Sequence, residues 1–424
     1  MRIPNWMAGL VAAVLVSTVG AVPARADSAA AVLQQMTSEG KLDEGLTAFE
    51  ERVKRDPQDQ EAKFALGILK FLKAVEGLAA EQYRFGLGSG IREQIRVPLF
   101  HEVLENPNPA KVRYQDVREM LLRFEKGLVE AEKTLATVDT SNVKLEFHPG
   151  LVQLDLNGDG QATEEESFWK IASQADRGLA REDAAKFVIQ ADGGDVHWLR
   201  GYCHFLMAFV DFAIAHDFRE LFERAGHLFY PDVDTPHTWI KGEPRPNDFF
   251  SFPNFADLVA AIHLINFEVI EPGRMQAAHH HLLVMIEQSR ESWKRIEAET
   301  DDDAEWIPNP KQMNTALRLP VTVNRDVIAG WHKVLDEAEA VLTGKKLVPF
   351  WRGDVKVAEA TGHGLGVNLK KVFLEPKRFD LVMWVSGTGA QPYLQEGEIS
   401  TSETWNRLTR VFQGEFFGFA VWFN

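Results

Sequence analysis

Residues 48–72, AFEERVKRDPQDQEAKFALGILKFL, contain two runs of apolar side chains separated by Asp56-Pro57. Within each run the apolar residues recur at spacings of three and four, which is typical of amphipathic helices. They are Ala48, Phe49 and Val53 before the proline, and Ala62, Ala65, Leu66, Leu69 and Leu72 after it. Because a residue preceding proline is disfavoured in a helix, Asp56-Pro57 ends the first helix and opens a turn. The stretch predicts a helical pair.

About residues 29–83 resemble a tetratricopeptide repeat. The matching positions are Gly40, Phe49, Asp56-Pro57, Ala62, Leu66 and Gly67, with Ala79 and Tyr83 continuing into a second unit. The pattern departs at Gly45, where alanine is usual, and no proline closes the second unit. The resemblance implies stacked helical pairs; the alternative is a single helical hairpin, because three repeats are normally needed to stack stably and no third is found.

The rest of the chain continues the helical pattern as far as residue 342. Amphipathic or apolar helical runs are expected at 114–137, 168–187, 196–229, 256–270 and 276–300, with Pro272-Gly273 splitting the last two. Asn324 is placed to cap a helix that ends at Leu342, before Gly344. Residues 370–373 and 380–386 instead favour short β-strands. The predicted fold class is mainly α, with a smaller mixed α/β C-terminal segment.

The chain is expected to divide into five segments. They are a leader at 1–26, helical tetratricopeptide-like residues 27–140, a calcium loop with its exiting helix at 141–175, a helical body at 176–300, and the mixed segment 301–424. The body contains a loop at 230–255 with five prolines. Loops of this length are usually functional or mobile.

The first 26 residues have the pattern of a cleaved secretory signal. Arg2 is followed by an uncharged, mostly apolar run at 7–22, and Ala24-Arg25-Ala26 has the small residues of a cleavage site. The alternative, an uncleaved membrane anchor, usually needs about 20 apolar residues. Cleavage after Ala26 predicts a secreted or periplasmic protein. The best later apolar stretch, 205–215, contains Asp211, so no membrane span is expected after cleavage.

Charge and cysteine content exclude several classes of protein. The chain of 424 residues has a net charge of −16, which would repel nucleic-acid phosphates, so no nucleic-acid partner is expected. Cys203 is the single cysteine, so an intrachain disulfide and a CxxC metal site are both excluded. Cys203 lies in an apolar helical run and is expected to be buried.

Residues 155–166, DLNGDGQATEEE, resemble the calcium-binding loop of an EF-hand. The resemblance implies that Asp155, Asn157 and Asp159 supply side-chain oxygens at alternate positions, and that Gly160 allows the sharp turn. Gln161 would supply its backbone carbonyl, Thr163 a direct or water-mediated contact, and Glu166 two oxygens. Ca²⁺ is therefore the expected cofactor, with an exiting helix from Glu164 to Ala172.

Three features depart from a paired EF-hand. Pro149-Gly150 stands where the entering helix should be, and Ala162 replaces the branched residue that bridges to a partner loop. No partner loop begins at Asp192. A solitary loop has no helix pair to open, so it is better suited to clamping local structure than to signalling. Affinities of ~10⁻⁴ to 10⁻³ M are sufficient outside the cell.

Two classes of function remain open. The leading expectation is an exported calcium-binding protein that is a non-catalytic binding or scaffold protein, with a protein or peptide partner on its helical surface. The alternative is an exported hydrolase-like enzyme with a cleft near Trp239 and the helices carrying His263, Glu268 and His280. A concave pocket with convergent histidine and carboxylate groups would favour the enzyme. His279-His280-His281 cannot itself converge on one ion, because successive helical residues point about 100° apart.

Overall fold

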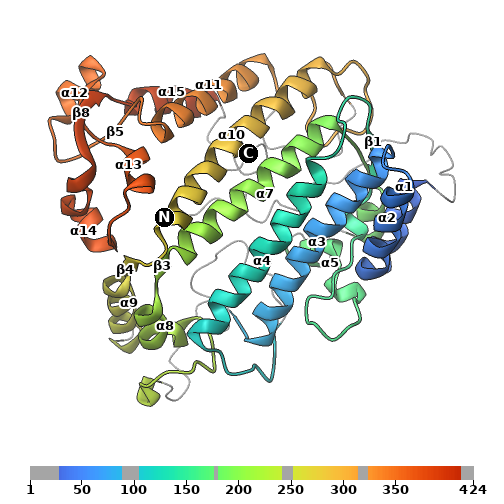
Figure 1. Cartoon of the computed structure of the whole chain (residues 1–424), viewed down its shortest axis with the longest axis horizontal. Coiled ribbons are helices and arrows are strands. Elements are labelled where there is room, and N and C mark those ends of the chain that lie inside the picture. The colour runs from blue at the N-terminus through green and yellow to red at the C-terminus, as the bar shows by residue number, and fades with distance from the viewer. Residues whose placement is uncertain (1–27, 88–104, 176–179, 241–251, 314–322, 412–424) are drawn as a thin grey trace.

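A computed structural model describes residues 28–87, 105–175, 180–240, 252–313 and 323–411, and shows a mainly helical protein (Figure 1). The predicted leader at 1–26 lies outside the described residues. Small sheets occur among the helices, most of them in the C-terminal part. The coarse prediction of a mainly α fold with a mixed C-terminal segment is confirmed.

The N-terminal part consists of four helices: α1 (Ala29–Ser38), α2 (Leu42–Arg55), α3 (Gln60–Arg84) and α4 (Tyr114–Leu135). The predicted turn at Asp56-Pro57 is present, and Asp59 caps α3 by accepting a hydrogen bond from the Ala62 N–H. α3 runs unbroken from Gln60 to Arg84, so Ala79 and Tyr83 lie on the same helix as Ala62. The tetratricopeptide resemblance itself stays a prediction.

Small residues let these helices approach closely. A Cβ built at Gly67 of α3 would lie 2.4 Å from Leu135 Cδ2 of α4. Phe49 of α2 is fully buried in the same core as Leu69 and Leu135. The apolar stripe predicted from residues 48–72 therefore faces the interior, except at Ala48, which is exposed.

Two long helices, α7 (Gly193–Ile214) and α10 (Pro272–Ala298), form the middle of the molecule. α3, α4, α7 and α10 lie as a row of long helices in Figure 1. α7 is apolar on most sides because it is covered by both α4 and α10. The shorter helices in this region are α5 (Phe168–Ala175), α6 (Arg181–Ala185), α8 (Arg219–Ala225) and α9 (Phe252–Leu264).

Two predicted helical runs are broken in the structure. The run at 196–229 is interrupted by β3 (His216–Asp217), which pairs antiparallel with β4 (Asn266–Val269). The run at 168–187 is interrupted at Ala180, which is extended before α6 begins at Arg181. Pro272-Gly273 lies in the first turn of α10, where proline is tolerated, and not between two helices. The sequence predicted which stretches are helical, but it did not predict where the helices are interrupted.

The sheets are small and antiparallel. β1 (Lys144–Phe147) pairs with β2 (Ile189–Asp192), and β4 also pairs with β7 (Phe379–Asp380). A third sheet joins β5 (Val348–Pro349), β6 (His363–Val367) and β8 (Leu394–Glu398). The helices around it are α11 (Arg325–Leu342), α12 (Val355–Thr361), α13 (Leu369–Leu374), α14 (Leu381–Ser386) and α15 (Ser402–Val411).

The strands expected at 370–373 and 380–386 are wrong, since both stretches are helical, as α13 and α14. Asn368 and Asp380 cap these helices by accepting hydrogen bonds from the N–H groups of Lys371 and Met383. A short apolar run fits either structure, and the cap residue decides it here. The predicted cap at Asn324 is confirmed: its Oδ1 accepts hydrogen bonds from Asp326 and Val327.

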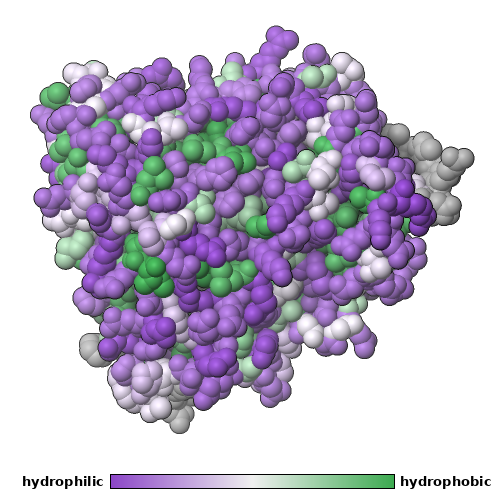
Figure 2. All heavy atoms as spheres, in the orientation of Figure 1, coloured by the Kyte–Doolittle hydropathy of each residue, from purple (hydrophilic) through white to green (hydrophobic). Residues whose placement is uncertain are grey.

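The surface is largely hydrophilic. In Figure 2 hydrophilic side chains cover most of the face in view, and apolar residues form separate small patches. Within the described ranges, no helix has the length and apolar character needed to cross a membrane.

Candidate functional sites: an acidic loop and a charged pocket

The loop at 155–166 is organised around Asp155. Its Oδ1 accepts hydrogen bonds from the backbone N–H groups of Gly158 (2.8 Å) and Asp159 (3.1 Å), and its Oδ2 accepts one from Gly160 (2.8 Å). Gly158 and Gly160 have φ angles of +73° and +88°, a region that favours glycine. The carboxylate of Asp155 therefore holds the first half of the loop together through three backbone hydrogen bonds.

The next two predicted ligands repeat this arrangement. Asn157 Oδ1 accepts a hydrogen bond from the Asp159 N–H, and Asp159 Oδ1 accepts one from the Gln161 N–H, both at 2.8 Å. Short side-chain acceptors that bond backbone two residues ahead stabilise such turns. Gln161 and Thr163 are exposed on the outer side of the loop.

Glu166 closes the loop from its last position. Its side chain is fully buried, with Oε1 accepting from the N–H groups of Leu156 (3.0 Å) and Asn157 (3.1 Å). Its Oε2 accepts from the Thr163 N–H (2.9 Å) and the Thr163 hydroxyl (2.7 Å). One buried carboxylate thus joins both halves of the loop.

The loop rests on the N-terminal helices and not on a second loop. The Asp155 N–H donates to Glu76 of α3 (2.9 Å), and the Gln153 N–H donates to the Thr37 carbonyl at the end of α1 (2.9 Å). Ala162, at the position that bridges to a partner in paired EF-hands, lies against Gly40 in the turn between α1 and α2. Asp192, where a partner loop would begin, caps α7.

The segments on either side of the loop differ from those of an EF-hand. The entry contains only a 3₁₀ turn, η2 (Pro149–Leu151), in place of an entering helix. The exiting helix predicted from Glu164 is wrong in its start: η3 (Glu164–Glu166) is a 3₁₀ turn, and α5 begins at Phe168. Ser167 is extended because it bridges Gln153, and the Phe168 N–H donates to the Val152 carbonyl.

The oxygen atoms of the loop are those that Ca²⁺ prefers: three carboxylates, an amide, a hydroxyl and backbone carbonyls. Among the residues that the structure describes, no three His, Cys, Asp or Glu side chains are gathered to hold a metal ion. The carboxylates of Asp155, Asp159 and Glu166 are instead turned to backbone N–H groups. The donor set fits calcium in its chemistry, and binding would need these oxygens to turn towards the ion.

The residues of the predicted enzyme cleft are on separate elements. His263 lies on α9 and is exposed, and Glu268 on β4 is 3.5 Å from Arg378. His280 is exposed on α10, and Trp239 is 79% exposed. The neighbours of His280 also point apart, since His279 bonds the Leu342 carbonyl while His281 faces α7. As expected, the three histidines do not converge.

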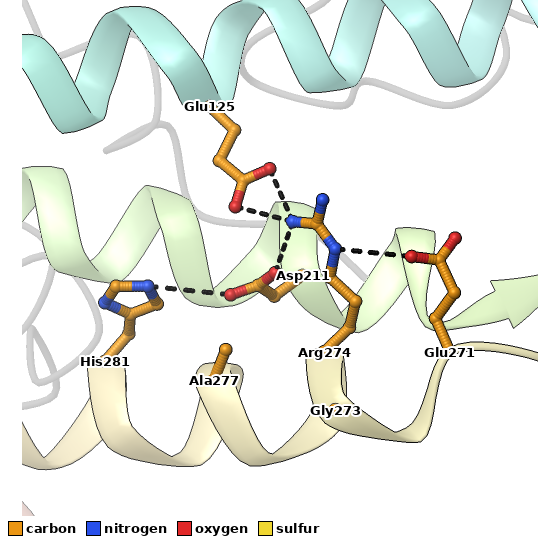
Figure 3. A pocket seen from close by; sticks show the side chains of 7 residues that line it. All are labelled: Glu125, Asp211, Glu271, Gly273, Arg274, Ala277 and His281. Carbon is orange, nitrogen blue, oxygen red and sulfur yellow. Dashed lines mark hydrogen bonds and ion pairs between the residues drawn. The ribbon is translucent and has the colours of Figure 1, made fainter.

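A pocket of about 500 Å³ lies where α4, α7 and α10 meet (Figure 3). Its polar lining consists of Glu125, Asp211, Glu271, Arg274 and His281. Figure 3 shows Arg274 reaching from α10 across α7 to Glu125 on α4. Arg274 Nη1 lies 2.6 Å from both Glu125 oxygens and 2.8 Å from Asp211 Oδ1. Three helices are therefore joined by one guanidinium group.

His281 extends this network into the protein. Its Nδ1 lies 2.8 Å from His204 Nδ1, and His204 Nε2 lies 3.6 Å from Glu132, which also binds Arg200 at 2.9 Å. On the pocket side, His281 Nε2 lies 3.5 Å from Asp211 Oδ2. Two Nδ1 atoms at this distance must share one proton, so the tautomers of the two imidazoles are linked.

The electrostatics follow from burial. Burial and the neighbouring imidazoles of His204 and His280 lower the pKa of His281 to about 4, so its ring is neutral at pH 7. Burial raises the pKa of Asp211 and of Glu125, although Arg274 opposes both shifts. Deeper in the network, hydrogen bonds from His204 and Arg200 lower the pKa of Glu132 to about 2.

Sequence reasoning missed this pocket, although a signal was present. Each of the three helices carries two polar residues seven positions apart: Glu125 and Glu132, His204 and Asp211, Arg274 and His281. Seven residues are two helical turns, so each pair lies on one face. Helix packing brings the pairs on α4, α7 and α10 together. The spacing of residues within one helix does not reveal which helices pack against each other.

Comparisons of this chain with models of known protein families, with curated proteins and with solved structures gave no match.

Proposed function

We propose that this chain is an exported calcium-binding protein in which Ca²⁺, bound by the loop at 155–166, clamps the N-terminal helices to the rest of the fold. The observation that carries the proposal is the buried Glu166 at the last position of the loop. It is bonded to both halves of the loop, while the first residue, Asp155, is bonded to Glu76 of α3. An ion held between Asp155 and Glu166 would strengthen the same connection.

Calcium would serve structure here and not signalling. The loop has neither an entering helix nor a partner loop among the described residues, so no helix pair could open. The loop contacts Gly40 in the turn between α1 and α2 and Glu76 of α3, and Gln153 just before the loop bonds Thr37 of α1. The protein is then a calcium-stabilised helical scaffold, with a protein or peptide as partner.

Thermal unfolding with Ca²⁺, with Mg²⁺ and with chelator tests the proposal on the chain from Asp27 to Asn424. Ca²⁺ at 100 times its Kd should stabilise the protein by about 2.7 kcal/mol. Glu166→Gln should abolish the calcium-dependent rise in Tm, because it removes one of two coordinating oxygens. Glu165→Gln is the matched control, since Glu165 is exposed and pairs with Lys170 (2.9 Å).

Glu166→Gln also disturbs hydrogen bonds within the loop. A lower Tm of this variant in chelator would therefore say nothing about calcium binding. Asp159→Asn is a milder second variant, because Asp159 is exposed and its Oδ1 acceptor is kept. It should shrink the calcium-dependent rise without lowering the Tm measured in chelator. An equal rise in all variants, or no rise at millimolar Ca²⁺, would refute the calcium site.

The charged pocket favours a second candidate, an acid–base enzyme that also carries a structural calcium. His281 is a neutral imidazole facing the pocket, and its other nitrogen is positioned by His204, which is in turn positioned by Glu132. A base oriented by a further hydrogen-bonded group is the arrangement that general-base catalysis needs. None of the described residues that line the pocket is a Ser, Thr or Cys, so water would be the nucleophile of a hydrolase.

Hydrolysis of chromogenic esters, amides and phosphate esters tests this candidate. Turnover that is lost in His281→Gln and kept in His280→Gln would support His281 as the base, since His280 is its exposed neighbour. Turnover that survives His281→Gln would place the chemistry elsewhere.

A further inference from the structure

Asp211 carries a buried oxygen that no described residue satisfies. The Asp211 side chain is 1% exposed, and its Oδ1 is held by Arg274, but its Oδ2 accepts no hydrogen bond from the residues that the structure describes. An unsatisfied buried acceptor costs about 1–3 kcal/mol, more when it is charged. Asp211 lines the pocket, and a rotation of its carboxylate would turn this buried oxygen towards a donor bound there.

With Glu125, Asp211 and Glu271 all ionised, the groups around the pocket are one positive charge short of balance. Arg274 binds Glu125 and Asp211, and Arg118 binds the Glu271 carboxylate at 2.6 Å. Three carboxylates thus face two guanidinium groups, and the neutral His281 adds no charge. A bound cation would restore the balance and would favour the ionised forms of Glu125 and Asp211.

His281 can offer a hydrogen-bond acceptor to that cation, because its tautomer is linked to the hydrogen bonds of His204 and Glu132. If His204 donates from Nε2 to Glu132, its Nδ1 accepts from His281 Nδ1–H. His281 Nε2 is then a lone pair, and it lies 3.5 Å from Asp211 Oδ2. Two acceptors at this separation can both bond one nitrogen that carries two or more hydrogens.

From these three observations we propose that the pocket binds a small organic ligand through a protonated amine, held between Asp211 Oδ2 and His281 Nε2. The inference deepens the second candidate function and rests on the same pocket. Binding does not require turnover, however, so it can hold if the protein proves to be a binder and not an enzyme.

An organic ammonium fits the pocket better than a bare metal ion. The volume of about 500 Å³ is in the range of small-molecule sites, about 300–1,000 Å³. Ala277 and Gly273 leave room beside the charged groups for an apolar chain. Among the described residues no three metal-ligating side chains converge, whereas an ammonium needs only two or three acceptors.

Isothermal titration with n-butylamine at pH 7.5 tests the proposal, with n-butanol and butyrate as ligands of similar shape but different charge. Butylamine should bind with saturation at one site per chain, and the other two should not bind. Asp211→Asn should weaken binding at least tenfold, because it removes the charge but keeps the Oδ1 acceptor for Arg274. Asp336→Asn is the matched control, since Asp336 is exposed on α11 and pairs with Arg290.

Ala277→Leu guards against a folding defect in Asp211→Asn. It fills the pocket without changing any charge, and it should also weaken butylamine binding at least tenfold. Equal affinity in the parent protein and in either pocket variant would overturn the proposal, as would no saturable binding of butylamine. A parallel titration with Zn²⁺ gives a further contrary outcome: Zn²⁺ binding that Asp211→Asn removes, without butylamine binding, would make the pocket a metal site.

Discussion

Glu166 and Asp211 are both buried carboxylates, and they differ in how well their oxygens are satisfied. Glu166 accepts four hydrogen bonds from the loop that it closes. Asp211 has one oxygen held by Arg274 and one with no donor among the described residues. Buried polar groups are nearly always hydrogen-bonded, so the first is explained by local structure and the second points to a missing partner.

Cys203 provides a residue-scale prediction about burial. Its side chain is fully buried in α7, and burial raises the pKa of its thiol. We expect no labelling by iodoacetamide in the native protein at pH 8, and complete labelling in urea. Rapid native labelling would show that the α4–α7–α10 interface opens.

Among the secondary-structure elements, the positions of several helices could be predicted from the sequence, but the elements that each helix packs against could not. The apolar spacing placed α2, α3 and α4, and Asn324 placed the start of α11. The sequence did not predict the helix ends that are set by β pairing, at His216 and at Ser167. The residues that pair with them, Val269 and Gln153, are too far away in sequence for the helical pattern to reveal the pairing. The short helices α13 and α14 were mistaken for strands for lack of length.

Two glycines of α3 give a prediction with an internal control. A Cβ at Gly67 would lie 2.4 Å from Leu135 Cδ2, whereas a Cβ at Gly77 would meet nothing within 4 Å. Gly67→Ala should lower the free energy of unfolding by about 1–3 kcal/mol, because α4 must shift. Gly77→Ala should raise it by about 0.5–1 kcal/mol through helix propensity. Urea unfolding measures both; equal effects would contradict the close packing of α3 on α4.

At the scale of the whole molecule, distant segments meet at a cluster of buried and half-buried carboxyl groups. Asp192 and Asp195 at the start of α7 lie near Glu305, and Asp192 also lies near Glu299. Gln312 donates to both glutamates (3.1 and 3.0 Å). Burial, together with Asp192, raises the pKa of Asp195 to about 8, of Glu299 to about 9 and of Glu305 to about 8. The folded protein therefore favours the protonated forms of these groups.

This cluster predicts how stability depends on pH. A carboxyl group with a raised folded pKa stabilises fully below its unfolded pKa, near 4, and loses that contribution as the pH rises through its folded value. The contribution of these groups to the free energy of unfolding should therefore fall between pH 5 and pH 9. Glu305→Gln should flatten the fall, because the amide never ionises and keeps an acceptor for Gln312. Urea unfolding at several pH values measures this, with Glu403→Gln, an exposed residue of α15, as the control; an unchanged slope in Glu305→Gln would count against the cluster.

The sequence by itself determined what depends on neighbours along the chain: helical periodicity, the turn at Asp56-Pro57, the caps and the turn-forming acceptors of the loop at 155–166. These arise from contacts within a few residues, so spacing reveals them. Tertiary packing, in contrast, sets the contacts of the loop with α1 and α3, and it combines the paired polar residues of α4, α7 and α10 into one pocket. Such contacts depend on which helix faces meet, and that is set by the packing of the whole core.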